Sequence, residues 1–248
     1  MKEKIKDGYT NTSYRDNNVF YQEKKHNGWN HQIDYTIFKD LDFIPKLIEN
    51  TPNSVSWQWI DNKKNVWDEY TIREVAKNLK KFHNSKLQLP PKNLTQRYEN
   101  YRRILKEKGI DTKEVWEFKD RVNDILNNAR DLWPVHNDLY GSNVMTSVDN
   151  KIYFVDWEYA TMGDKHFDLA FFIVASIHNE EREKWFLDEY QDYSEEQYTK
   201  YKMVICYFII IWAYSLDKMP IDINYWLKRI NDEWNNYHYK KQNNLFKN

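Results

Sequence analysis

Residues 135–156 restrict the fold of this chain more than any other stretch. Two short apolar runs, 144–146 and 152–155, have the length and the residue types of β-strands, and the Asp-Asn pair at 149–150 between them is typical of a turn. The sequence therefore predicts a hairpin. A loop of polar residues leads into this hairpin, and Asp156 follows directly where it ends.

The polar loop carries residue types that suit phosphoryl transfer. That reaction needs a group that orients the attacking hydroxyl and oxygen ligands for a metal ion on the nucleotide phosphates. Asp138 and Asn143 are separated by four residues, which is the Asp-to-Asn spacing of kinase catalytic loops. Magnesium prefers hard oxygen ligands, so the Asn143 amide and the Asp156 carboxylate are chemically suitable. The pattern predicts a phosphoryl-transfer site.

Length and charge restrict the class of protein further. The chain has 248 residues, of which 41% are apolar and 30% charged, which is enough for one compact unit or two joined lobes. The formal net charge is −1, and lysine and arginine are spread along the chain. Nucleic acid is therefore not expected as a partner, because such binding needs a concentrated basic face.

The chain shows no sign of a membrane segment. The N-terminus lacks the apolar core of a secretion signal. The apolar run 204–212 has roughly half of the ~20 residues that cross a bilayer, so it predicts a core helix. The single cysteine, Cys206, lies in this run and is expected to be a buried apolar side chain. We expect a cytoplasmic protein without membrane insertion.

The remaining sequence predicts a small sheet followed by helices. The stretches 19–24 and 55–60 have strand patterns bounded by turn residues, and apolar residues over 33–41 have helical spacing. From residue 67 onward helical patterns dominate. Polar residues that can cap a helix open four predicted helices, at Thr71, Asp111, Ser194 and Asp222.

Three motifs together resemble the aminoglycoside phosphotransferase and choline kinase superfamily. They are His-Asn-Asp-Leu-Tyr-Gly-Ser-Asn-Val at 136–144, Val-Asp-Trp-Glu-Tyr-Ala-Thr-Met-Gly-Asp at 155–164, and Phe-Asp-Leu-Ala at 167–170. The segment Asp-Trp-Glu-Tyr at 156–159 is most similar to bacterial choline kinases of the lipopolysaccharide-choline type. The resemblance is strong over 133–171 and thin in the first 60 residues.

This resemblance implies an α+β, bilobal, protein-kinase-like fold that uses ATP and Mg²⁺. A reduced N-terminal sheet lobe would span residues 1–62, and a mainly helical C-terminal lobe would span residues 63–248. Carried over by position, the resemblance implies roles for five residues. These are Asp138 as the catalytic base, Asn143 and Asp156 as magnesium ligands, and His136 and Asp168 as residues that brace the loop.

The resemblance also implies nucleotide-binding residues in the N-terminal lobe. The segment 8–11 is similar to the family's Gly-x-Thr-Asn turn, where backbone N–H groups approach phosphates. Lys24 is the expected phosphate-contacting residue, with Asp34 as its acidic partner, and an alignment shifted by two residues places Gln22 there instead. The nucleotide-binding residues expected in this lobe are Thr10, Asn11, Lys24, Asp34, Trp59 and Ile60.

For the acceptor, the resemblance implies choline, with Glu158, Tyr159 and Trp212 as substrate-binding residues. Aromatic faces and a carboxylate suit a quaternary ammonium group. Two positions depart from the family, because Ile209 stands where choline kinases carry the first of two cage tryptophans, and Ala175 stands where some of them carry an acid. Ethanolamine, thiamine or an aminoglycoside is therefore an alternative acceptor. The alternative of another class is a nucleotide-binding pseudokinase or scaffold.

Overall fold

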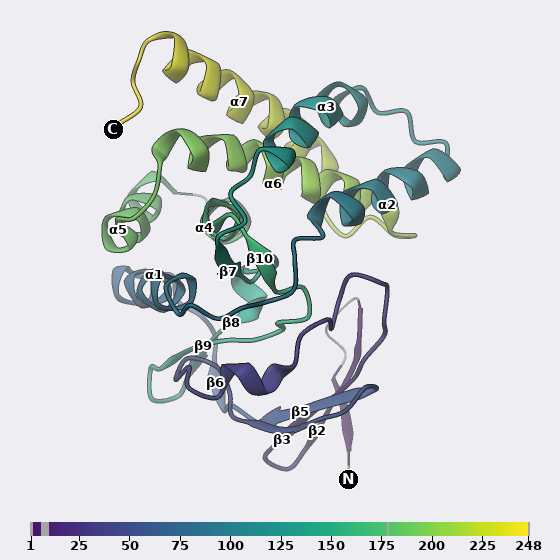
Figure 1. The fold of residues 1–248 in the computed structure, drawn as a ribbon, viewed down its shortest axis with the longest axis vertical. Coiled ribbons are helices and arrows are strands. Elements are labelled where there is room, and N and C mark those ends of the chain that lie inside the picture. The colour runs from purple at the N-terminus through teal and green to yellow at the C-terminus, as the bar shows by residue number, and fades with distance from the viewer. Residues whose placement is uncertain (1, 6–9, 178, 248) are drawn as a thin grey trace.

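The computed structural model describes residues 2–5, 10–177 and 179–247. Figure 1 shows a sheet at the N-terminal end of the molecule and a set of helices at the other end, with short strands between them. The predicted α+β, kinase-like fold, with an antiparallel N-terminal sheet and a mainly helical C-terminal part, is confirmed.

The N-terminal sheet has five antiparallel strands in the order β1-β2-β3-β5-β4. They are β1 (Glu3–Ile5), β2 (Thr12–Asp16), β3 (Val19–Glu23), β4 (Leu47–Asn50) and β5 (Ser54–Gln58). Asn17 has a φ of 53° in the tight turn between β2 and β3, a conformation that asparagine tolerates better than most residues. The strands predicted over 19–24 and 55–60 are confirmed, and each ends slightly earlier than predicted.

The segment between β3 and β4 is less helical than its spacing predicts. The helix predicted over 33–41 is reduced to one 3-10 turn, η1 (Tyr35–Phe38), which Asp34 caps by accepting the Thr36 N–H. Ile33, Tyr35 and Phe38 are buried, and the rings of Tyr35 and Phe38 contact each other in place of a helical stripe. The Phe38 ring lies 4.7 Å from the ring of Trp157, so this segment packs directly against the residues that follow the hairpin.

The predicted hairpin is confirmed. β8 (Val144–Ser147) and β9 (Ile152–Phe154) pair antiparallel, and Asn150 has a φ of 67° in the turn between them. β6 (Asn62–Lys63) extends this sheet, which has the order β6-β8-β9. The predicted lobe boundary after residue 62 therefore falls inside β6, a strand that belongs to the hairpin sheet.

A second strand pair supports the polar loop. β7 (Trp133–Val135) precedes the loop and pairs antiparallel with β10 (Thr161–Gly163). A Cβ atom at Gly163 would lie 2.6 Å from Val135 Cγ2, so the close approach of these strands requires glycine at this position. A 3-10 turn, η2 (Gly141–Asn143), then carries the loop into β8.

The C-terminal part is built around one apolar helix. Its helices are α1 (Glu69–His83), α2 (Leu94–Glu107), α3 (Lys113–Asn127), α4 (Lys165–Ser176), α5 (Glu180–Tyr190), α6 (Glu195–Ser215) and α7 (Ile223–Gln242). α6 contacts α2, α3, α4 and α7, and Cys206 in its middle is fully buried, as predicted. Among the described residues, no helix is long and apolar enough to cross a membrane.

Two of the four predicted helix starts are confirmed at the predicted residue. Ser194 and Asp222 cap α6 and α7 through their side chains, whereas α3 begins one residue later than predicted, with Thr112 in place of Asp111 at its N-cap. The start predicted at Thr71 is wrong, because Asp68 caps α1 and accepts the Thr71 N–H at 2.8 Å. Both residue types can cap a helix, and the chain enters the helix at the earlier one.

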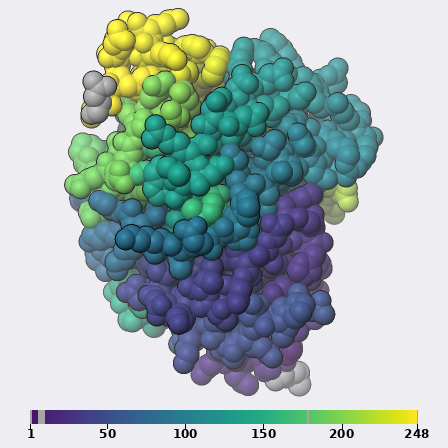
Figure 2. Space-filling view, viewed as in Figure 1, coloured from purple at the N-terminus to yellow at the C-terminus, as the bar shows by residue number. Residues whose placement is uncertain are grey.

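The two parts of the molecule are in direct contact. In the space-filling view, the purple N-terminal residues lie against blue and teal residues of the helical part (Figure 2). Asn93, just before α2, donates from its side chain to the backbone oxygen of Trp29 at 2.8 Å. The N-terminal segment therefore packs against the beginning of α2, beside the polar loop described next.

Candidate active site

Asp168 in the first turn of α4 holds the polar loop in place. Its carboxylate is fully buried and accepts the backbone N–H groups of His136 at 2.7 Å and Asn137 at 2.9 Å. His83 donates to the same carboxylate from Nε2 at 3.1 Å, and the Tyr190 hydroxyl donates to its Nδ1 at 2.7 Å. Burial lowers the pKa of His83, which agrees with a neutral ring in this chain of bonds.

His136 and Asn137 connect the loop to the residues after the hairpin. His136 Nε2 bonds to the backbone oxygen of Val155 at 3.0 Å. Asn137 adopts a φ of 63° and donates from its side chain to the backbone oxygen of Tyr159 at 3.0 Å. The loop and the segment after the hairpin are thus tied together at both residues, which is the geometry that a bracing role requires.

The structure brings Asp138 and Asn143 into contact. Asn143 Nδ2 donates to the backbone oxygen of Asp138 at 2.8 Å and to its carboxylate at 3.2 Å. Burial raises the pKa of Asp138 to about 7, and the negative charge of Glu158 adds to this effect, while Arg97 and Asn143 oppose it. A carboxylate in such an environment can exchange a proton near neutral pH.

Asp156 presents a carboxylate that needs a positive partner. It has a φ of 62°, and its Oδ1 is buried without a hydrogen-bond partner among the described residues. Its pKa lies well above the usual range because of burial, and then because of the nearby charges of Glu158 and Asp138. The backbone of Val155, the preceding residue, donates to the backbone oxygen of Asn143 at 3.0 Å.

The donor set around Asp156 fits magnesium. Mg²⁺ binds one or two carboxylates and completes its shell with waters and substrate phosphates. The unpartnered Oδ1 of Asp156 and the side-chain amide of Asn143 would provide such a partial shell. Among the residues that the structure describes, no three or more His, Cys, Asp or Glu side chains are grouped so that they could hold a metal ion by themselves.

Glu158 ties the N-terminal segment to this site. Its carboxylate accepts from Asn11 at 3.0 Å and from Asn30 at 2.7 Å, and it pairs with His31 at 3.2 Å. Burial alone would raise its pKa, but these three partners outweigh burial and lower it. Asn11 and Glu158, which the sequence assigns to nucleotide and acceptor, therefore contact each other.

The structure brings Gln22 to Asp156 and places Lys24 elsewhere. Gln22 is buried on β3, and its side chain interacts with the Asp156 carboxylate. Lys24 lies one residue beyond β3 and donates to Asn50 at 2.7 Å and to the backbone of Thr51 at 2.6 Å. Gln22, the residue that the shifted alignment offers, is thus the one at Asp156, while Lys24 lies where the charge of Asp34 acts on it. The strand ends at residue 23, so Lys24 does not continue the face on which Gln22 lies.

The other residues expected in the N-terminal lobe are spread around the sheet. Asp34 caps η1 and accepts from Asn50 at 3.3 Å, so Asn50 bridges it to Lys24. The Thr10 side chain interacts with the Tyr159 hydroxyl. Trp59 and Ile60 follow β5, and the backbone N–H of Trp59 donates to Asn18 at 2.8 Å.

An aromatic cluster with a buried arginine lies beside Asp138. The Arg97 guanidinium carbon is 3.6 Å from the ring centre of Tyr159 and 4.6 Å from that of Phe208. Arg97 Nη2 lies 3.8 Å from Asp138 Oδ1. Phe208 lies on α6 one helical turn before Trp212 and next to Ile209, the position where the resemblance leads one to expect a tryptophan. Neither Arg97 nor Phe208 was expected from the sequence.

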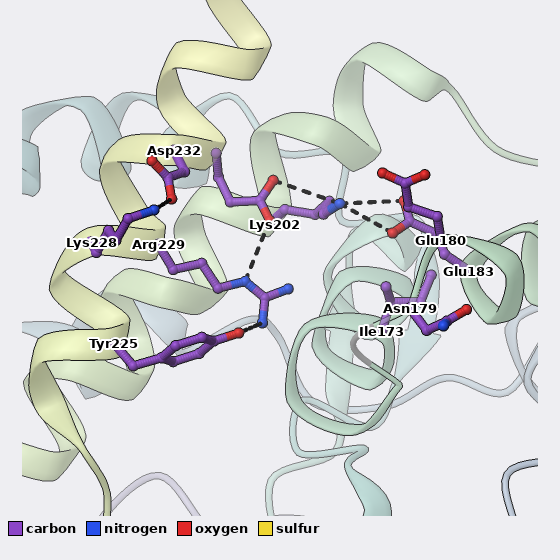
Figure 3. A pocket seen from close by; sticks show the side chains of 10 residues that line it. Ile173, Asn179, Glu180, Glu183, Lys202, Tyr225, Lys228, Arg229 and Asp232 are labelled. Atoms are coloured by element: carbon purple, nitrogen blue, oxygen red, sulfur yellow. Dashed lines mark hydrogen bonds and ion pairs between the residues drawn. The ribbon is translucent and has the colours of Figure 1, made fainter.

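A separate cavity lies on another face of the helical part and contains none of these residues. It has a volume of about 340 Å³ and is lined by α5, α6 and α7 together with Ile173 of α4 (Figure 3). Its basic side chains are paired with acidic ones: Lys202 lies 3.2 Å from Glu183, and Arg229 lies 3.5 Å from Glu233. It is therefore distinct from the candidate active site.

The fold and the site together define a class of protein. An antiparallel sheet packs on a helical part, a braced loop carries Asp138 and Asn143, and a hairpin ends at the buried Asp156 carboxylate. This arrangement is that of a kinase-like phosphotransferase.

Comparison with known proteins agrees with this class. Residues 47–204 match the model of the phosphotransferase enzyme family, and the chain belongs to this family. It is an ATP-dependent kinase that acts on an alcohol. The Protein LicA homolog of Mycoplasma capricolum subsp. capricolum is 41% identical over 230 residues, which cover 93% of this chain and 96% of that protein.

Solved structures show the same fold at low sequence identity. The crystal structure of choline kinase LicA from Streptococcus pneumoniae has a TM-score of 0.72 and 18% identity, with 96% of this chain and 93% of that chain covered. The structure of LicA in complex with AMP has a TM-score of 0.70 and 19% identity, with coverages of 96% and 91%.

Proposed function

We propose that this protein transfers the γ-phosphate of ATP to the hydroxyl of choline, giving phosphocholine and ADP. The observation that carries this proposal is the aromatic cluster beside Asp138, which accommodates a delocalised cation 3.6 Å from the Tyr159 ring. Quaternary ammonium groups favour such aromatic faces. The fold similarity to the choline kinase of S. pneumoniae supports the same acceptor.

In the proposed reaction, Asp138 orients the acceptor hydroxyl and takes its proton as the hydroxyl oxygen bonds to the γ-phosphorus. The bond between that phosphorus and the bridging oxygen of ADP breaks, and ADP leaves with the electron pair. Asn143 and Asp156 would hold Mg²⁺, which neutralises charge on the phosphates when bound. Asp168 and His136 keep the loop in the required position, since both bond to it or to its neighbours.

We assign the nucleotide to the N-terminal lobe, residues 1–62, and the acceptor to residues 63–248. Gln22 is proposed as the β3 residue nearest the phosphates, because it faces Asp156. Thr10, Trp59 and Ile60 stay assigned to the nucleotide. Tyr159 and Trp212 stay assigned to the acceptor, and Glu158 acts on the site through its bonds to the N-terminal segment.

The test is an ADP-release assay with ATP and magnesium and a panel of choline, ethanolamine, thiamine and aminoglycosides. We expect the highest kcat/KM for choline, with the Asp138→Asn variant as the inactive control. A higher kcat/KM for another alcohol would replace choline as the acceptor. ATP binding without stimulation by any alcohol would instead support the pseudokinase alternative.

A further inference from the structure

Arg97 places a permanent positive charge in the aromatic cluster assigned to the acceptor. We propose that Arg97 is the resident cation of the acceptor site and competes with the acceptor: its guanidinium occupies the cation position and gives way to the ammonium group of the incoming alcohol. This inference rests on the proposed function, because it requires a cationic acceptor.

The surroundings of Arg97 match those that a quaternary ammonium group needs. Its side chain is buried, with 3% of the residue exposed, and its guanidinium carbon lies 3.6 Å from the Tyr159 ring, 4.6 Å from the Phe208 ring and 6.0 Å from the Tyr101 ring. A guanidinium is a weakly hydrated, delocalised cation that stacks on aromatic faces. A trimethylammonium group uses the same faces for the same reason.

The cluster offers one carboxylate to a cation. Asp138 Oδ1 lies 3.8 Å from Arg97 Nη2. Glu158 is already bonded to Asn11, Asn30 and His31 on its N-terminal side. Two cations that share a single carboxylate in a buried site repel each other strongly, because little water screens them. The ammonium group and the guanidinium are therefore expected to exchange and not to bind together.

The polar contacts of Arg97 are long for a buried guanidinium. It donates to the Tyr101 hydroxyl at 3.4 Å and to the backbone oxygen of Asn137 at 3.5 Å, beside the 3.8 Å approach to Asp138. Charge-assisted hydrogen bonds are usually ~2.7–2.9 Å long. Arg73 shows the contrast, with bonds of 2.7 and 2.9 Å to Glu69. Arg97 can thus leave its position without breaking a short hydrogen bond.

The first test compares choline with 3,3-dimethylbutan-1-ol, which has the same shape but no charge. We expect the Arg97→Met variant to raise the ratio of kcat/KM for choline to that for the neutral alcohol about tenfold over wild type, because the cluster and Asp138 become free for the ammonium group. Arg97→Lys is the matched control, since it keeps the charge and should keep the ratio close to wild type. An unchanged or lower ratio in Arg97→Met would overturn the inference.

The second test uses the wild-type enzyme and does not depend on a variant that folds. Phenylglyoxal modifies exposed arginines, and tandem mass spectrometry reads the modification at each site. Choline should increase labelling of Arg97, while labelling of the exposed Arg103, whose side chain is 61% accessible, should stay constant. Equal or reduced labelling of Arg97 would overturn the exchange.

The two proposals fail in different ways. Turnover of choline with an unchanged ratio and unchanged labelling refutes only the role of Arg97. If the wild-type enzyme prefers another cationic alcohol, choline is refuted as the acceptor. The role of Arg97 is then tested by the ratio of kcat/KM for that alcohol to kcat/KM for its uncharged carbon analogue. A wild-type enzyme that prefers an uncharged alcohol refutes both proposals.

Discussion

Replacement of Asp168 by asparagine should separate the bracing of the loop from its chemistry. The carboxylate accepts two backbone N–H groups and one His83 N–H, all in a fully buried environment. Asparagine has nearly the same shape but only one accepting oxygen, so its NH₂ group must face a donor. At least one buried N–H then loses its partner, which costs about 1–3 kcal/mol.

We therefore expect Asp168→Asn to lower the free energy of unfolding by about 1–3 kcal/mol. Asp168→Ala should lower it by about 3–9 kcal/mol, because alanine leaves the two backbone N–H groups and the His83 N–H unpaired. Since Asp138 lies on the braced loop, kcat should fall roughly 100-fold in Asp168→Asn, as displacements of about 1 Å can have effects of that size. The KM for ATP should change much less.

Urea titration followed by tryptophan fluorescence measures the stability, and the ADP-release assay measures kcat. Asp164→Asn is the matched control on the same helix. Asp164 caps α4 by accepting the His166 N–H at 3.0 Å, and asparagine is also a good cap, so this variant should keep kcat close to wild type. An Asp168→Asn enzyme with wild-type stability and wild-type kcat would show that the loop does not depend on this carboxylate.

Four further outcomes are expected. Asp138→Asn should reduce kcat about 10²–10⁴-fold and leave ATP binding, measured by calorimetry, nearly unchanged. Gln22→Leu should raise the KM for ATP severalfold, while Lys24→Met should not, since only Gln22 faces Asp156. The Cys206 thiol, whose pKa is raised by burial, should resist Ellman's reagent at pH 8 until the protein unfolds in urea. Hydrogen bonds from Thr71 lower the pKa of Asp68, so the ionised cap stabilises the fold at pH values above the unfolded pKa. Asp68→Ala should therefore lower the free energy of unfolding by about 1 kcal/mol at pH 7. In acid the variant should be almost as stable as wild type, because protonation of Asp68 removes the same contribution from wild type.

The sequence predicted elements well where the signal is local. The hairpin at 144–155 was predictable because a turn pair separates two strand-like runs, and the caps of α6 and α7 because a polar side chain stands next to an apolar pattern. The start of α1 could not be predicted from the sequence, because Asp68 and Thr71 are both good capping residues and only the path of the chain decides between them.

The residues of the candidate site likewise fall into those that a local pattern identifies and those that only the packing brings together. Asp138, Asn143 and Asp156 lie within one loop and one hairpin, so a spacing motif identifies them. Arg97 and Phe208 come from α2 and α6 and meet near Tyr159 only through the packing of those helices. No local pattern marks such residues, because their role depends on contacts between distant parts of the chain. The choice between Gln22 and Lys24 likewise depends on where β3 ends.

The three carboxylates of the site explain why its parts depend on one another. Glu158 raises the pKa of Asp138 and of Asp156, and Asp138 raises the pKa of Asp156, because like charges gather in a buried space. Glu158 is balanced by the N-terminal segment, and Asp138 by Arg97. Asp156 is the carboxylate whose Oδ1 has no hydrogen-bond partner among the described residues, so the nucleotide with its metal ion would complete the charge balance there. In this arrangement, the N-terminal partners of Glu158 and the cation beside Asp138 relieve repulsion between the carboxylates, and a metal ion at Asp156 would do the same.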